Sequence, residues 1–199
     1  MRDMLLRLLV SKIPGWLSPD RAVEMYRFVR EHRPEVAVEI GVFGGRSLLA
    51  IAMAMQDNGY GKIYGIDPWK NSDCVEGDHN EPDRRWWSKV DLHNVHRLCM
   101  EFLWKYHLDN HVTIIRSTSQ GCHEIIPSNI GVLYIDGNHS EVASCRDVEL
   151  FVPKVALGGH IWMDDCDWTS TKKAQQMMEG ICELVYDRGT YRLYRKAHA

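Results

Sequence analysis

The segment VEIGVFGGRS (residues 38–47) carries the strongest structural signal in the chain. An apolar run, residues 35–40, enters this glycine-rich loop, and residues 46–55 continue with a helical pattern. A strand, a tight glycine turn and a helix, in that order, are typical of a parallel α/β sheet. Glycine at such a turn lets another group approach the backbone closely, and the helix start offers free N–H groups to an anion. The segment therefore predicts a ligand site at the end of the first strand.

Further short apolar runs predict six more strands, at residues 62–66, 111–115, 131–135, 160–163, 182–186 and 191–194. Helical patterns are expected at residues 4–13, 19–33, 46–55, 86–107, 140–151 and 171–181. Ser18 is expected to cap the second helix, with Pro19 at its first position. The alternation predicts an α/β fold: a mainly parallel seven-stranded sheet with helices on both faces and a C-terminal antiparallel hairpin.

Length favours a single domain, residues 1–199, because 199 residues suffice for one core. Residues 1–34 would form an N-terminal helical extension, and residues 69–107 an insert and helix on the substrate side. Residues 69–85 are polar and irregular, including Asp73, Asp78, His79, Asn80 and Glu81, and two interpretations stay open: a substrate lid or a disordered loop.

Composition excludes several classes of protein. Apolar residues make up 45%, charged residues 26%, and the net charge of −3 does not favour a non-specific nucleic-acid binder. No run is long enough to span a membrane. The basic, apolar start is expected to be an amphipathic helix and not a signal peptide, because Arg7 interrupts it and no small-residue cleavage site follows. Six scattered cysteines without a CxxC pair suggest reduced thiols in the cytoplasm and argue against a thiolate zinc site.

The second strand ends in Asp67, within IYGIDPW (residues 63–69). An acidic residue at this point of a parallel sheet typically accepts hydrogen bonds from ribose hydroxyls. The glycine spacing is not GxGxxG and no GK[ST] follows, which disfavours a dinucleotide fingerprint and a P-loop. A NAD-dependent oxidoreductase is the weaker alternative, since no Tyr-x-x-x-Lys relay is evident either.

These motifs, with IIRSTSQ (114–120), VLYIDGNH (132–139) and GGHIWMDD (158–165), resemble the strand-end motifs of class I S-adenosylmethionine (SAM)-dependent methyltransferases. Within that Rossmann-like group they are most similar to metal-dependent O-methyltransferases of the catechol and macrolide-sugar types. The resemblance implies SAM as cosubstrate. It assigns the SAM contacts to Glu39, Gly41, Gly45, Ser47, Asp67, Ser119, Gln120 and Asp136.

Three acids follow two neighbouring strands: Asp136 ends one, and Asp164 and Asp165 end the next. Carboxylates brought together in this way repel one another unless a hard cation lies between them. We expect a Mg²⁺ or other divalent metal site formed by Asp136, Asp164 and Asp165. The resemblance supports this set, since the matching positions in those families are Asp, Asp and Asn or Asp. The alternative is that the acids only cap turns.

His139 follows Asp136 by three residues, where the catechol-type enzymes carry a lysine as general base. An imidazole is a competent base at neutral pH, so we expect His139 and Asp136 to be catalytic. The alternative is a solvent-facing histidine at a helix start.

The acceptor is expected to be a small molecule, with a saccharide hydroxyl favoured by the polar insert and by Trp69, Trp86 and Trp87, and a catechol or phenol as alternative. A non-catalytic SAM-binding module also stays open. No nucleic-acid or membrane partner is expected. The apolar N-terminal helices could support a homodimer.

Overall fold

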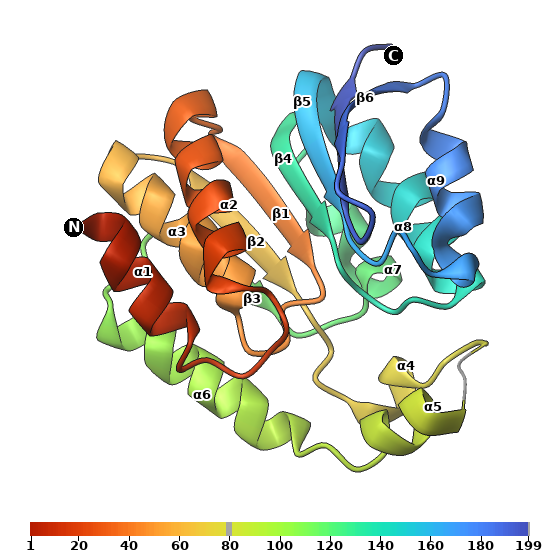
Figure 1. Ribbon diagram of the computed structural model, residues 1–199, viewed down its shortest axis with the longest axis horizontal. Helices are drawn as coiled ribbons and strands as arrows, with labels where there is room; N and C mark the ends of the chain where they lie inside the picture. Colours follow the sequence, from red (N-terminus) through yellow and green to blue (C-terminus); the bar gives the residue numbers. More distant parts are fainter. Residues whose placement is uncertain (79–80, 199) are drawn as a thin grey trace.

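The computed structural model describes residues 1–78 and 81–198 (Figure 1). Its seven strands form one sheet in the order β3-β2-β1-β4-β5-β7-β6. Six strands share one direction, and β7 alone runs antiparallel, between β5 and β6. This confirms the predicted fold class. The strands are β1 (Val36–Ile40), β2 (Lys62–Ile66), β3 (Val112–Ile115), β4 (Ile130–Ile135), β5 (Val155–Met163), β6 (Cys182–Asp187) and β7 (Arg192–Lys196).

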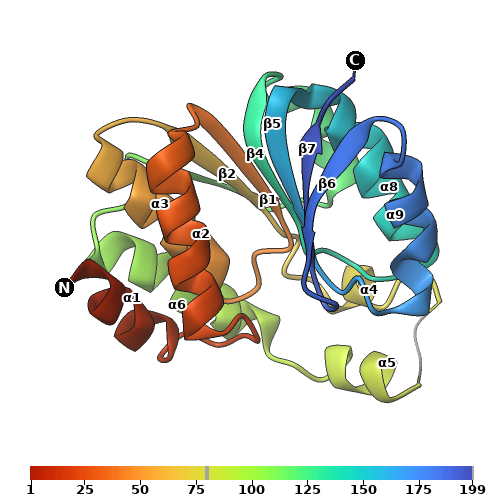
Figure 2. The ribbon, with the colours of Figure 1, turned by 45° about the horizontal axis from the view of Figure 1, so that its top comes forward.

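Helices cover both faces of the sheet, as Figure 2 shows, with α1, α2, α3 and α6 on one side and α8 and α9 on the other. Two short helices, α4 and α5, lie beyond the edge at which the parallel strands end (bottom of Figure 1). The α-helices are α1 (Arg2–Val10), α2 (Pro19–His32), α3 (Arg46–Asn58), α4 (Asn71–Cys74), α5 (Glu81–Trp87), α6 (Leu92–Lys105), α7 (Ser119–Cys122), α8 (Glu141–Phe151) and α9 (Lys172–Met178). Short 3-10 turns occupy residues 123–125, 152–154 and 169–171.

The core has two halves, one on each face of the sheet. Successive strand residues point to opposite faces, so Tyr134 and Trp162 belong to the half under α1, α2 and α3. Their neighbours Ile135 and Ile161 belong to the half under α8 and α9. Because both faces are buried, the central strands are mostly apolar, with Glu39 of β1 as a buried exception, and this explains why short apolar runs identified them.

The N-terminal helices are held to the sheet by α3. The hydroxyl of Ser18 accepts a hydrogen bond from the Arg21 amide, and Pro19 begins α2, so the predicted cap is confirmed. Arg46 of α3 donates to the carbonyl oxygens of Ile13 and Leu17 at 2.7 and 2.8 Å and so ties down the connection between α1 and α2. This fixes the connection beside the strand ends.

Besides small shifts at helix ends, two predicted elements are organised differently in the structure. Strand β5 begins at Val155, not at residue 160, because Gly158-Gly159 lies inside the strand as an irregularity and is not a turn before it. The predicted helix 86–107 is two helices, since Asp91 accepts a hydrogen bond from the Asn94 amide and starts α6 anew. Within the insert, α4 and α5 replace the expected irregular chain, and His79 and Asn80 lie outside the described residues.

All six cysteines are free thiols. Across residues 1–78 and 81–198, the helices are too short or too polar to cross a membrane.

Gly41 brings the ends of the two central strands together. Strand order reverses between β1 and β4, where such sheets place their ligands. A Cβ atom on Gly41 would lie 1.9 Å from the carbonyl oxygen of Asp136, and its φ of +88° disfavours any L side chain. The glycine is therefore required by the neighbouring strand end, although the sequence suggested that it makes room for a ligand.

Gly41→Ala is expected to destabilise the protein much more than Gly59→Ala. Both residues have a left-handed φ, but a Cβ on Gly59 would meet nothing within 4 Å, so that variant shows the backbone strain alone. The strain is worth about 1–2 kcal/mol, and the clash with backbone should add at least about 2 kcal/mol. Urea unfolding of both variants measures the difference. Equal losses would mean that β1 and β4 separate readily at this point.

Candidate active site

A cavity of about 1040 Å³ opens at the carboxyl ends of the parallel strands. It lies between those ends, the connection from α1 to α2, and the insert. Nine of the eleven predicted site residues line it: Gly41, Gly45, Ser47, Asp67, Ser119, Asp136, His139, Asp164 and Asp165. The other two, Glu39 and Gln120, lie outside the lining, Glu39 buried within the sheet and Gln120 exposed.

Glu39 acts on the cavity through Ser47. The Ser47 hydroxyl donates to Glu39 Oε1 at 2.6 Å, which orients the serine, and Ser47 reaches the cavity from the first turn of α3. Glu39 Oε2 has no hydrogen-bond partner among the described residues. Burial raises the pKa of Glu39 to about 8, and the Ser47 hydrogen bond offsets only part of this effect. The Glu39 carboxyl group therefore keeps its proton to a higher pH than an exposed glutamate does.

Asp67 fixes the shape of the glycine-rich loop. One carboxylate oxygen accepts a hydrogen bond from the Phe43 amide at 2.8 Å, and the other accepts one from the Trp69 amide at 2.7 Å. Phe43 and Trp69 both have left-handed backbone, with φ of 48° and 43°. Strained residues held by a carboxylate at a cavity wall indicate a preorganised ligand site. Burial raises the pKa of Asp67, although these amide hydrogen bonds oppose the effect.

Ser119 lines the cavity and contacts a buried acid, Asp147. The Ser119 hydroxyl donates to Asp147, a buried acid on α8 that also lines the cavity. Burial raises the pKa of Asp147 to about 7, against the lowering effect of Ser119. The motifs did not point to Asp147, because it lies within a helix pattern and far from the strand ends in sequence.

Asp136, His139 and Asp165 form a compact cluster. One ligand atom from each lies within 4.8 Å of the other two, and His139 Nε2 is 3.0 Å from Asp165 Oδ2. Burial, followed by the charges of Asp164 and Asp165, raises the pKa of Asp136 well above its usual value. Burial likewise raises the pKa of Asp165, although the nearby His139 lowers it in part. Mutual repulsion of this kind, and the oxygen and nitrogen donors available, fit a divalent cation.

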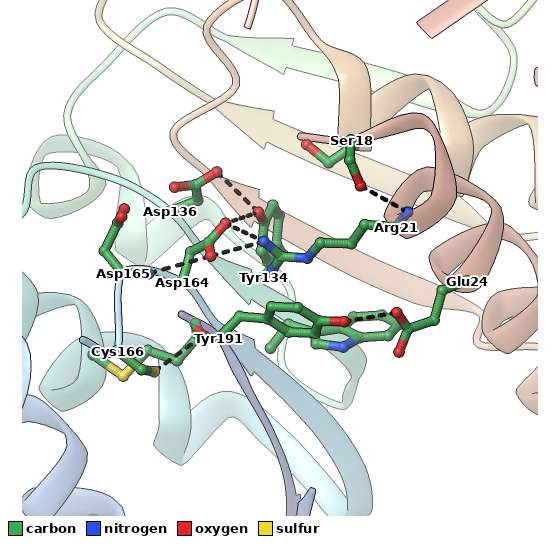
Figure 3. A network of polar contacts seen from close by, with 12 residues as sticks. Ser18, Arg21, Glu24, Tyr134, Asp136, Asp164, Asp165, Cys166 and Tyr191 are labelled. Carbon is green, nitrogen blue, oxygen red and sulfur yellow. Dashed lines mark hydrogen bonds and ion pairs between the residues drawn. The ribbon is translucent and has the colours of Figure 1, made fainter. Parts of the chain in front are cut away.

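Asp164, which the sequence placed in the metal site, is not part of this cluster and pairs with Arg21 instead. Arg21 of α2 donates from Nη1 to both of its carboxylate oxygens, at 2.8 and 2.7 Å (Figure 3). The Tyr134 hydroxyl lies 2.5 Å from Asp164 Oδ2 and 2.9 Å from Asp136 Oδ2. Sequence reasoning missed Arg21, because nothing in the first turn of a helix indicates a partner 143 positions away.

Four aromatic rings form a cluster at the cavity, which we call the aromatic wall: Trp16, Phe43, Trp86 and Trp87. The ring centroid of Trp16 lies 5.0 Å from that of Phe43 and 5.1 Å from that of Trp86. The ring centroids of Trp86 and Trp87 are 4.8 Å apart. Trp16 is 69% exposed, so much of its ring surface is open to a ligand in the cavity. Trp69 is instead buried, and its indole N–H donates to the Phe43 carbonyl oxygen at 2.9 Å.

Comparisons with known proteins agree with this geometry. The family described as "Methyltransferase domain" matches residues 38–166, which include all three strand-end acids. A protein of Acanthamoeba polyphaga mimivirus, "Uncharacterized protein R132", is 28% identical over 160 residues, which cover 79% of this chain. The match spans 63% of the length of that relative.

Solved structures share the fold. The SAH-bound methyltransferase PaMTH1 of Podospora anserina aligns with a TM-score of 0.70 and 12% identity, over 98% of this chain and 87% of that one. The O-methyltransferase TomG of Streptomyces achromogenes, in complex with SAM, aligns with a TM-score of 0.65 and 12% identity, over 92% of this chain and 82% of that one.

The chain belongs to the methyltransferase-domain family. Its seven-stranded sheet is the fold of the SAM- and SAH-bound methyltransferases above, and the family match confirms the resemblance to class I SAM-dependent methyltransferases drawn from the motifs.

Glu39→Gln is expected to weaken the dependence of stability on pH. A carboxyl group with a pKa of about 8 when folded and about 4.5 when unfolded stabilises the fold fully below pH 4.5, and this stabilisation is lost as the pH rises through 8. Without SAM, the free energy of unfolding of Glu39→Gln should therefore rise relative to the unaltered protein between pH 5 and 8, by roughly 2–4 kcal/mol.

Denaturant titrations across that pH range measure the difference, with the exposed Glu35→Gln as control. Parallel curves for the unaltered protein and Glu39→Gln would show that Glu39 ionises normally.

Proposed function

We propose that the protein transfers a methyl group from SAM to a hydroxyl oxygen of a small molecule, with a sugar or glycoside as the favoured acceptor. One observation carries the proposal: a single cavity joins the glycine-rich loop after β1, the carboxylate cluster after β4 and β5, and the aromatic wall. A donor site, a site for an activated hydroxyl and a surface for an acceptor ring are thus adjacent.

The donor half of the cavity is formed by the ends of β1 and β2. Ser47, held by Glu39, offers a hydroxyl at the start of α3, and helix starts favour negatively charged groups such as a carboxylate. Asp67 has lone pairs beyond those used by the two amides, and we assign these to ribose hydroxyls. We assign Ser119, which also lines the cavity, to the adenine. SAM supplies an electrophilic methyl group, so the chain mainly has to position the reactants.

The cation would be held by Asp136 and Asp165, whose carboxylates are the crowded pair beside His139. A divalent ion there would attract an acceptor hydroxyl and lower its pKa. Oxygen donors suit Mg²⁺, and a histidine nearby also suits Mn²⁺.

His139 is proposed as the general base. Its Nε2 faces Asp165 Oδ2, so Asp165 can hold the proton on Nε2 and leave the lone pair on Nδ1. That nitrogen would take the hydroxyl proton as the oxygen attacks the methyl group. The ring of His139 also lies 5.1 Å from that of Trp168, which limits its orientation.

The acceptor surface favours a sugar because apolar rings and acids line the same cavity. Trp16 and Trp86 present ring faces, on which the C–H face of a sugar can stack. Asp20, Asp73 and Glu76 line the cavity as well, and carboxylates accept hydrogen bonds from sugar hydroxyls. These acids already pair with Arg7, Lys70 and Arg146, and a sugar would engage their remaining lone pairs as well as the aromatic wall, whereas a phenol would use the wall alone.

Chelation is expected to abolish methyl transfer, and Mg²⁺ or Mn²⁺ to restore it. Asp165→Asn should reduce turnover at least about a hundredfold, since one ligand of the cation is lost. The exposed Asp167→Asn is the matched control, because that acid lies two residues away and outside the cavity lining.

The measurement is transfer of labelled methyl from SAM to panels of glycosides and catechols, with SAM affinity followed by calorimetry. Full turnover after exhaustive chelation would reject the cation site. SAM binding without transfer to either panel would favour a binding module instead of an enzyme.

His139→Ala should lower turnover by about 10²–10⁴-fold while SAM and Mn²⁺ affinities stay unchanged, as expected for loss of a base. The exposed His93→Ala on α6 should leave all three quantities unaltered. A tenfold or greater loss of Mn²⁺ affinity in His139→Ala would make this residue a cation ligand and overturn the base assignment. Turnover within a few-fold of the unaltered protein would remove both roles.

A further inference from the structure

Arg21 contacts the acidic cluster through Asp164, and it comes from outside the region that the family matches. It lies in the first turn of α2, whereas the match begins at residue 38. Its Nη1 contacts both oxygens of Asp164, and the two side chains are only 12% and 14% exposed. Burial weakens the competition from water, so this ion pair is far more persistent than one on the surface.

The guanidinium group is fixed from several sides. It lies over the ring of Tyr191, 3.7 Å from the ring centroid, and 5.5 Å from that of Tyr134. The Tyr191 hydroxyl donates to Glu24 Oε2 at 2.8 Å, one turn further along α2 (Figure 3). Tyr191, which immediately precedes β7, and helix α2 thus hold Arg21 against Asp164. A planar guanidinium stacked on an aromatic ring is a geometry that lysine reproduces poorly.

The charges then match one divalent ion. Asp136, Asp164 and Asp165 carry three negative charges when ionised, and Arg21 neutralises one of them. Two negative charges are left, on the two acids whose donor atoms cluster with His139. The Tyr134 hydroxyl bridges Asp136 and Asp164, so the position of Asp164 also affects that of Asp136.

We propose that Arg21 is a positioning residue that keeps Asp164 as its own counter-ion and out of the cation site, so that Asp136 and Asp165 alone supply the carboxylates. This rests on the proposed cation-assisted function and deepens it. It changes the ligand set expected from the motifs. It also makes the N-terminal helices part of the catalytic geometry, since the sheet alone would leave three uncompensated acids together.

Binding of Mn²⁺, followed by electron paramagnetic resonance and without SAM or acceptor, tests the proposal in the full chain. Asp164→Asn removes no proposed ligand, so its Mn²⁺ affinity should stay within about threefold of that of the unaltered protein. Asp165→Asn removes a proposed ligand, so its Mn²⁺ affinity should fall at least about tenfold. Arg21→Met keeps the apolar stem and removes the charge, which frees Asp164. It should bind Mn²⁺ at least about threefold more tightly and yet turn over at least about tenfold more slowly.

Arg21→Lys should return the Mn²⁺ affinity toward that of the unaltered protein, and so should the double variant Arg21→Met/Asp164→Asn, since each restores the charge balance. A purely structural role for Arg21 predicts the opposite sign, a parallel loss of Mn²⁺ affinity and of thermal stability. That result, or unchanged affinity in Arg21→Met, would overturn the proposal. Failure of the unaltered protein to bind Mn²⁺ would instead reject the cation site itself, and this role of Arg21 with it.

Discussion

Repulsion among carboxylates at the ends of β4 and β5 is the constraint to which the surrounding structure responds. Parallel pairing of the two strands places Asp136 beside Asp164 and Asp165, and all three are only partly exposed to water, at the wall of the cavity. Such a group of acids is tolerated only when cations and hydrogen-bond donors compensate it. Arg21 and the Tyr134 hydroxyl supply part of this compensation. The remainder defines the place where a metal ion would be most strongly attracted.

The docking of the N-terminal helices follows from the same constraint. Apolar packing attaches α1 and α2 to α3, but this packing alone would not specify where the first turn of α2 lies. The ion pair between Arg21 and Asp164 and the hydrogen bonds from Tyr186 and Tyr191 to Glu24 fix its register against β5, β6 and β7. Buried polar contacts of this kind contribute less to net stability than to the choice of a single arrangement.

Sequence patterns predicted the features that depend on residues close together in the chain. The seven strands, the cap at Ser18 and the strand-end positions of Asp67 and Asp136 follow from apolar periodicity and turn residues, which act over a few positions. The partner of Asp164 could not be predicted, because Arg21 is distant in sequence and typical of any exposed helix start. Trp16 was not predicted either, because it follows the helix expected at residues 4–13 and belongs to no recognisable motif. The glycine pair in β5 was misinterpreted because an irregular strand and a turn use the same residues.

Different segments of the chain form different parts of the cavity, and this affects how acceptor specificity can change between related proteins. Residues 38–166 hold the loop after β1 and the acids after β4 and β5, whereas Trp16 and Arg21 come from the preceding segment. That segment is attached through an apolar face, which many sequences can satisfy, and through Arg21 and Glu24, whose contacts a replacement segment would have to keep. Paralogues could therefore exchange it and acquire a new acceptor surface over an unaltered donor pocket. Residues 1–34 are the natural recombination unit for building chimeric enzymes on this scaffold.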